Sequence, residues 1–229
     1  MRFLECILLL SSLLFYACES EKRVSPLPPE NIILGKADSV FTTYFGAIEK
    51  FGRAEKNELQ YVRNYIYGID GRLFEENLFS SNGELLGKYL YKYDDQGRQA
   101  KCDIYNGDGT LGNTNTYEYK MDRKEIIHNA YADGDNLWMK NVSKLDQDDN
   151  IAELVSYNGQ DSVIGKSMYQ YDKNGNQIER IMYDDGGELM SRLSFEYADF
   201  DTKGNWSTQI VFENGRPITV ISRKIIYPN

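Results

Sequence analysis

A repeated unit constrains this chain more than any other feature of its sequence. The tripeptide Tyr-x-Tyr, or a variant of it, begins at six positions spaced 26 residues apart: Tyr65, Tyr91, Tyr117, Ser143, Tyr169 and Phe195. A second aromatic residue follows each start at a constant interval, at Phe79, Tyr105, Tyr131, Tyr157 and Tyr183, and a short insertion displaces it to Phe212 in the last unit. Six units in one register make the repeat the framework of the fold.

Each repeat unit has room for two strands and two turns. Two turns of about four residues leave strands of about nine residues. Connections this short join only antiparallel neighbours. We therefore predict an all-β fold, an antiparallel β-meander of about twelve strands built from six 26-residue units. The sheet must be strongly twisted or curled to cover its aromatic face, and barrel, spiral and sandwich closures all fit the pattern.

The two faces of the predicted sheet differ in polarity. In the strand 189–197, Leu193, Phe195 and Tyr197 share one face and Arg192 lies on the other. The same register predicts a basic row on the second face, at Lys88, Thr114, Lys140, Lys166 and Arg192. We interpret this row as a solvated outer surface, with steering of a ligand as the alternative.

Units three and four depart from the pattern. Their first turns read Asp122-Arg-Lys124 and Gln147-Asp-Asp-Asn150, and Ser143 and Leu145 replace the tyrosine pair of unit four. We interpret these differences as sequence drift; a bend or a site is the alternative.

The segment ahead of the repeats has helical spacing. Val40, Phe41, Tyr44, Phe45, Ile48 and Phe51 recur at helical intervals, Asp38 or Ser39 can serve as N-cap, and Gly52 stands where a C-terminal cap belongs. We predict one N-terminal helix that caps the open edge of the first repeat.

The first residues resemble a bacterial lipoprotein signal. An apolar run from Ile7 ends at Ala17 directly before Cys18, and the sequence then turns polar. The resemblance implies a signal peptide over 1–17 and a lipid on Cys18, which would anchor the protein to the cell outer membrane on one face or the other. We further predict a proline-containing tether over 18–30, an N-terminal helix region over 31–57 and a repeat domain over 58–229.

The sequence offers little for catalysis or for metal binding. Cys102 is the one thiol left after Cys6 and Cys18, and with the single histidine, His128, it occupies one repeat position, so we interpret both as ordinary repeat residues rather than a catalytic pair. The segments Asn106–Gly109, Asp133–Asp135 and Asp146–Asn150 resemble calcium loops but are explained by turn chemistry. We predict no catalytic residue, no metal site and no cofactor. A net charge of −9 argues against a nucleic-acid partner.

The segments Tyr91–Arg98 and Tyr169–Asn176 resemble the tyrosine–aspartate (YD) repeats of the RHS family. The end of the chain, with Lys203–Trp206 and Asn214–Thr219, is similar to small RHS-repeat-like lipoproteins of Bacteroidota. The resemblance implies a β architecture. In the large RHS proteins such repeats form a spiral shell around a toxin, whereas this chain is too short to enclose a cargo.

We therefore predict a non-enzymatic lipoprotein of the cell envelope that acts as a binding or structural module, with the membrane and a protein or glycan ligand as its partners. Three alternatives stay open. They are a carbohydrate-associated surface protein, a hydrolase with two carboxylates, and an immunity protein associated with RHS-type toxins.

The lipid anchor predicts a labelling difference. Radiolabelled palmitate should label the wild-type protein and not the variant Cys18→Ala, because that thiol is the predicted attachment site. Equal labelling of both proteins would contradict the lipoprotein assignment.

Overall fold

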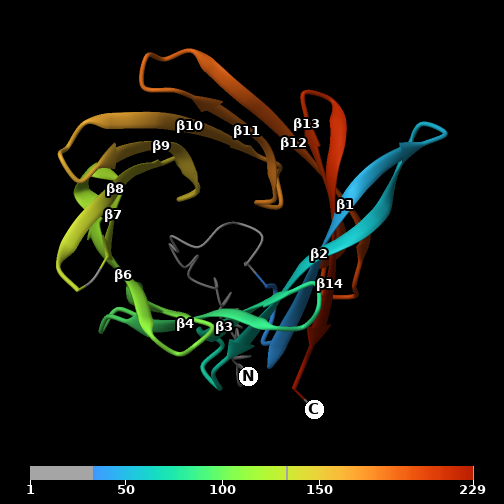
Figure 1. Cartoon of the computed structure of the whole chain (residues 1–229), viewed down its shortest axis with the longest axis horizontal. Helices are drawn as coiled ribbons and strands as arrows, with labels where there is room; N and C mark the ends of the chain where they lie inside the picture. The colour runs from blue at the N-terminus through green and yellow to red at the C-terminus, as the bar shows by residue number, and fades with distance from the viewer. Residues whose placement is uncertain (1–32, 133, 229) are drawn as a thin grey trace, which may run out of the picture.

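The computed structural model describes residues 33–132 and 134–228, which form a closed antiparallel barrel (Figure 1). The fourteen strands of these residues are β1 (Ser39–Lys50), β2 (Arg53–Tyr67), β3 (Leu73–Ser80), β4 (Leu85–Tyr93), β5 (Gln99–Asn106), β6 (Leu111–Lys120), β7 (Glu125–Ala132), β8 (Asn136–Leu145), β9 (Ile151–Asn158), β10 (Val163–Tyr171), β11 (Gln177–Tyr183), β12 (Leu189–Phe200), β13 (Trp206–Glu213) and β14 (Arg216–Ile226). The described residues include no α-helix, and a single 3-10 turn, η2 (Met121–Arg123), joins β6 to β7.

Each strand pairs with its neighbours in sequence, and β1 closes the ring. β1 hydrogen-bonds to β2 on one side and to β14 on the other, with Ser39 opposite both Ile66 and Ile226. Since both edges of the meander are used, the described barrel has no open sheet edge along its main wall.

The predicted fold class is therefore wrong in strand number and in the capping helix, and of the three closures left open the structure has the barrel. The described residues are all-β and antiparallel, but they form a closed fourteen-stranded barrel and not a meander of about twelve strands. The six repeat units account for β2 to β13, and β1 and β14 are the two additional strands. Without these two strands the sheet would keep two free edges. The repeat count alone therefore underestimates the number of strands.

The predicted N-terminal helix is strand β1. Val40, Thr42 and Tyr44 are buried at alternate positions, whereas Phe41 is exposed on the other side of the strand. Its β-branched and aromatic residues favour a strand, and apolar residues on both faces produce spacings that also fit a helix. The predicted helix region 31–57 thus contains β1 and the start of β2.

The glycine assigned to a helix cap belongs to a hairpin turn instead. Phe51 and Gly52 form the two-residue loop between β1 and β2, with φ values of 51° and 75°. Positive φ at both residues is the requirement of a type I′ turn, which suits the twist of a two-stranded hairpin.

The signal peptide, Cys18 and the tether over 18–30 lie outside the described residues. Lipidation of Cys18 therefore stays a prediction.

The recurring tyrosines have a structural reason. The second tyrosine of the motif donates its hydroxyl hydrogen bond to the backbone carbonyl at the start of a preceding strand. This bond is made by Tyr93 to Leu73 (2.7 Å), Tyr119 to Gln99 (2.9 Å), Tyr171 to Ile151 (2.9 Å) and Tyr197 to Gln177 (2.7 Å). Each bond ties two strands together beyond their backbone ladder.

The recurring aspartates also have a structural reason. Asp172 follows Tyr171, and its Oδ1 accepts hydrogen bonds from the backbone N–H groups of Asn174 and Asn176 at 2.8 and 2.9 Å. Asp94, Asp146 and Asp201 accept equivalent bonds within their own turns. Burial alone would raise the pKa of the Asp172 carboxyl. The two backbone N–H groups, together with the side-chain amide of Asn176, outweigh burial and lower this pKa below its ordinary value. The Tyr-Asp pair thus fixes one strand end and one turn.

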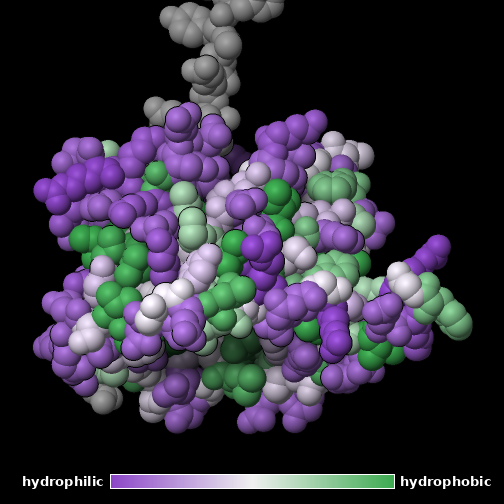
Figure 2. All heavy atoms as spheres, turned by 90° about the horizontal axis from the view of Figure 1, so that it is seen from above, coloured by the Kyte–Doolittle hydropathy of each residue, from purple (hydrophilic) through white to green (hydrophobic). Residues whose placement is uncertain are grey.

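The outer wall of the barrel carries cross-strand ion pairs. Lys88, Lys166 and Arg192 each contact a carboxylate on the preceding strand, namely Glu75, Glu153 and Glu179, at 3.5, 2.6 and 3.3 Å. Lys140 pairs with Asp161. One side of the molecule is correspondingly covered mainly by hydrophilic residues, with hydrophobic groups scattered among them (Figure 2). The basic row lies on a solvated surface, where such pairs contribute little to stability.

Buried apolar side chains concentrate where the barrel closes. One cluster joins Ala37, Val40, Tyr65 and Leu73, and a second joins Tyr44, Trp206, Val211 and Ile221. The opposite wall is packed less tightly, since every residue of β9 is only half-buried. The core therefore lines one part of the interior, and polar side chains occupy much of the rest.

The tyrosine–carbonyl bond predicts graded losses of stability. Tyr171→Phe should lower the free energy of unfolding by about 1 kcal/mol, because it removes the hydroxyl that bonds to Ile151 and keeps the ring. Tyr171→Ala should cost about 3 kcal/mol, because the ring is lost as well. Urea unfolding measures both, with the exposed neighbour Gln170→Ala as control, expected within about 0.5 kcal/mol of wild type. Equal stability of Tyr171→Phe and wild type would contradict a stabilising role for the hydroxyl.

Candidate binding site inside the barrel

One position of each repeat unit faces the barrel interior and differs in every unit. This interior belt consists of Glu76, Cys102, His128, Leu154, Arg180 and Gln209. The first five members stand directly across the sheet from the first residue of their Tyr-x-Tyr motifs, namely Tyr65, Tyr91, Tyr117, Ser143 and Tyr169. In the last unit, Gln209 stands across from Tyr197, the second aromatic residue of the motif. Tyr65 and Tyr197 contact the two core clusters, which places this register on the inner face.

The belt differs from the other repeat positions in its chemistry. Tyrosine, aspartate and glycine recur because strands and turns require them, as described above. The belt instead carries a carboxylate, a thiol, an imidazole, an aliphatic chain, a guanidinium and an amide. A position that varies in this way on a regular scaffold is suited to recognition rather than to packing.

Glu76 lies at the centre of a buried polar cluster. Its side chain is almost inaccessible, with Oε1 2.5 Å from Nη1 of Arg63 and Oε2 accepting the Tyr91 hydroxyl at 2.7 Å. Burial, followed by the nearby Glu76 carboxylate, raises the pKa of Tyr91 above its ordinary value. The carboxylate is therefore fully engaged in neutralising Arg63.

His128 is held as a neutral ring. It stacks on Tyr117 with ring centroids 4.9 Å apart and an interplanar angle of 13°. Its Nδ1 lies 3.1 Å from the Asn141 amide nitrogen, and burial lowers the pKa of the imidazole to about 4. With the amide N–H donating to Nδ1, the neutral ring carries its hydrogen on Nε2.

The amide of Gln99 belongs to the same neighbourhood through Tyr117. Burial raises the pKa of the Tyr117 hydroxyl above its ordinary value, and hydrogen bonds with the side chains of Asn115 and Gln99 partly offset this rise. The Tyr117 ring in turn stacks on His128. Gln99 and Asn141 therefore lie at either side of one aromatic stack.

Two buried polar atoms at this stack make no hydrogen bond within the described part of the chain. They are Nε2 of His128 and Oδ1 of Asn141. Asn141 is only 9% exposed. Buried donors and acceptors are normally paired, because an unpaired one costs about 1–3 kcal/mol. These two atoms therefore supply one donor and one acceptor for a bound group.

Cys102 and His128 do not form a catalytic pair. They lie on β5 and β7 with β6 between them, and the register places Cys102 opposite Asn115 while His128 is opposite Tyr117. Two strand spacings separate them by about 10 Å. Burial raises the pKa of the Cys102 thiol to about 12, so it stays protonated, and His128 is a poor base.

Arg180 is the cationic member of the belt. Its Nε and Nη2 lie 3.4 and 3.2 Å from the hydroxyl oxygen of Ser167, and its guanidinium lies over the Tyr169 ring with 5.6 Å between the guanidinium carbon and the centroid. Ser167 is buried, which fixes the side chain against β10.

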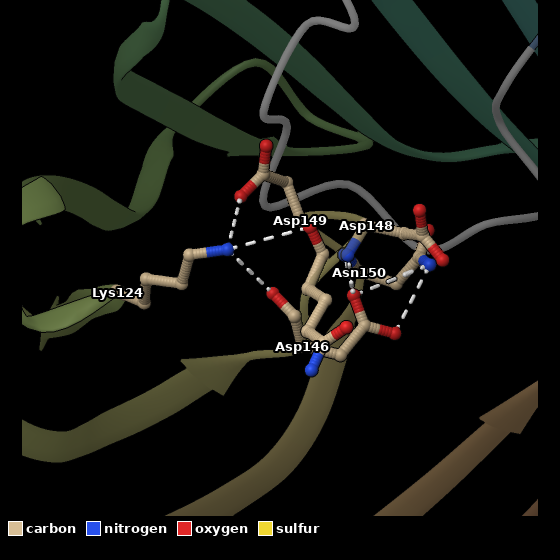
Figure 3. Close-up of polar contacts among 6 residues, drawn as sticks. Lys124, Asp146, Asp148, Asp149 and Asn150 are labelled. Atoms are coloured by element: carbon tan, nitrogen blue, oxygen red, sulfur yellow. Dashed lines mark hydrogen bonds and ion pairs between the residues drawn. The ribbon is translucent and has the colours of Figure 1, made fainter.

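Two of the segments that resemble calcium loops, Asn106–Gly109 and Asp146–Asn150, are turns in the structure. In the turn Asp146–Asn150, the Lys124 ammonium donates to the carbonyl oxygens of Asp146 and Gln147 at 2.9 and 3.4 Å and to Oδ1 of Asp149 at 3.3 Å (Figure 3). The Lys124 ammonium thus contacts the oxygen atoms that a bound metal ion would need as ligands. The altered turns of units three and four therefore contact each other.

The contacts of the other two segments give no indication of calcium binding. Asp108 of Asn106–Gly109 accepts bonds from the backbone N–H and hydroxyl of Thr110, and Asp133 lies outside the described residues. Over residues 33–132 and 134–228, no group of three or more His, Cys, Asp and Glu side chains is arranged to hold a metal ion.

The sequence contains the signal for this belt. Cys102 and His128 share one repeat position, and extending the repeat from them leads to Glu76, Leu154 and Arg180. What the sequence does not show is that Asn141 lies beside the stack with a polar atom left without a partner among the described residues.

The described part of the chain contains no helix of the length and hydrophobicity that crossing a membrane requires.

The lowered pKa of His128 predicts an acid-dependent loss of stability. Between about pH 6.5 and 4 the unfolded chain binds a proton that the folded ring does not, so stability falls as the pH falls through this window. Over this window the wild type should lose up to about 3 kcal/mol more than His128→Gln, measured by urea unfolding. NMR titration of this single histidine gives the pKa directly, and a value near 6.5 would contradict a buried neutral ring.

Comparison with known proteins gives only remote similarities. No protein-family model and no curated protein matches this chain. Among solved structures, a porin-like protein from Bacteroides uniformis is 10% identical over 82% of this chain and 96% of that chain, with a TM-score of 0.45. A DUF1329 family protein from Desulfovibrio piger is 12% identical over 85% and 87%, with a TM-score of 0.36. A putative outer membrane lipoprotein-sorting protein domain from Vibrio parahaemolyticus is 8% identical over 82% and 85%, with a TM-score of 0.32. Similarities this remote transfer no function to the chain.

Proposed function

We propose that this protein is a lipid-anchored, non-enzymatic lipoprotein of the outer membrane whose barrel binds a polar ligand in its interior. The single observation that carries the proposal is the pair of buried polar atoms of His128 and Asn141 that find no partner among the described residues. The lipid-anchored location rests on the lipoprotein-like signal that ends at Cys18.

The chemistry of these side chains favours an uncharged, hydroxylated ligand. The imidazole of His128 and the amide of Asn141 are neutral, and together they offer one donor and one acceptor. A hydroxyl group both donates and accepts, so a polyol matches this set better than an ion does. The face of the Tyr117–His128 stack adds an aromatic surface of the kind on which sugar rings pack. We therefore propose a carbohydrate as the ligand class.

Binding without catalysis is the simpler role for the same residues. A hydrolase needs an activated nucleophile or a free carboxylate pair. Here the Cys102 thiol is protonated, His128 is not basic at neutral pH, and Glu76 is engaged with Arg63 and Tyr91. The belt is equipped to hold a ligand rather than to cleave it.

We also propose that the repeats are related to the YD repeats of the RHS family. The hydroxyl bonds of Tyr93, Tyr119, Tyr171 and Tyr197 and the aspartate turns give the units a common set of contacts, which supports a common origin of the units.

The binding role is tested with a panel of neutral oligosaccharides and the full-length protein. At least one glycan should raise the melting temperature, and Asn141→Ala should weaken its binding about tenfold, measured by calorimetry, because the variant removes one hydrogen-bonding partner. Asn77→Ala is the matched control, since Asn77 is similarly buried but donates to Glu75 at 2.7 Å on the outer register. Absence of binding across the panel, or equal weakening by both variants, would contradict the proposal.

A further inference from the structure

Arg180, the arginine of the interior belt, differs from the interior Arg63 in its partners. Arg63 contacts Glu76 at 2.5 Å. Among residues 33–132 and 134–228, no carboxylate lies within ion-pair distance of Arg180, and the hydroxyl oxygen of Ser167 is its hydrogen-bond partner. A half-buried guanidinium that is held by a neutral hydroxyl group has no acidic side chain to offset its charge. It also has N–H donors left for an incoming group.

The nearby carboxylates are directed elsewhere. Glu179 precedes Arg180 but lies on the outer wall, where it contacts Arg192 at 3.3 Å. Glu213 lies on the same face of the sheet as Arg180. Arg180 pairs with Leu193 on β12, and Leu193 pairs with Glu213 on β13. Glu213 therefore lies two strands away, and its Oε1 accepts the Ser191 hydroxyl at 2.5 Å. Within the described residues, the charge of Arg180 is thus left without a local counterion.

The contacts of Arg180 also fix its orientation. Ser167 is 5% exposed and holds Nε and Nη2, and the Tyr169 ring lies beneath the guanidinium. Arginine presents donors in a planar fork that matches the oxygens of a carboxylate or a phosphate. A guanidinium already oriented by its neighbours loses little freedom when such a group binds.

We propose that Arg180, with Ser167 and Tyr169, is a subsite for an oxyanion, a carboxylate or a phosphate carried by the ligand. This inference rests on the proposed function and extends it. Arg180 on β11 and His128 on β7 are four strands apart, about 19 Å along the wall. A ligand that reaches both sites is therefore longer than a monosaccharide and has a neutral hydroxylated part and an anionic group.

The test uses simple anions and does not depend on the identity of the glycan. Inorganic phosphate and acetate are titrated separately into the full-length protein while the melting temperature is recorded, with sodium chloride at equal ionic strength as the reference. At about ten times its dissociation constant, the anion that the subsite accepts should raise the melting temperature by about 4 °C. The anion that gives the saturable rise identifies the group as phosphate-like or carboxylate-like.

Two variants assign the effect to Arg180. Arg180→Gln should abolish the rise, and Arg180→Lys should retain part of it, because lysine keeps the charge without the planar fork. Arg192→Gln is the matched control on the outer wall and should behave as the wild type does. No rise with either anion in the wild type, an undiminished rise in Arg180→Gln, or a loss in Arg192→Gln would each overturn the subsite.

The outcome separates the subsite from the binding role itself. If neutral oligosaccharides bind and Asn141→Ala weakens them while neither anion has an effect, the interior binding site stands and the anion subsite falls. If the anions act through Arg180 while no oligosaccharide binds, the subsite stands and the carbohydrate proposal falls.

Discussion

The fold depends on β1 pairing on both of its edges. A meander of short antiparallel strands always has two terminal edges, and their free N–H and C=O groups invite association with other sheets. Here β1 lies between β2 and β14 and satisfies both. The two buried apolar clusters gather around the same junction, with Val40 in one and Tyr44 in the other. Closure and core formation are therefore coupled, and the rest of the ring can be packed less tightly.

The repeat unit divides structural and chemical tasks among its positions. The second tyrosine ties strands together by its hydroxyl, and the aspartate after it orders the turn. Because these contacts recur in most units, the position opposite the first tyrosine can change from glutamate to cysteine, histidine or arginine without altering the frame.

The sequence predicts the repeating strands well and the closing strands poorly. Strands and turns of the six units follow from tyrosine and glycine spacing, since these residues act locally. For β1 the spacing predicts a helix because apolar residues occupy both faces, and only pairing with β14, at the far end of the chain, decides between the two structures. The binding site is similar: the repeat spacing connects Cys102, His128 and Arg180, but the unpaired polar atom of Asn141 depends on contacts that no spacing reveals.

Ser39 of β1 pairs with Ile226 of β14, so the ring of strands is continuous. Each strand would keep the same two neighbours wherever in the ring the chain began. Near these residues the first and last strands of the barrel lie side by side (Figure 1). A short linker could join their ends, and new termini could be opened at any of the hairpin turns while each strand keeps both neighbours. The architecture is thus cyclic, and a circularly permuted chain opened between two belt residues would present the same interior from a different starting point.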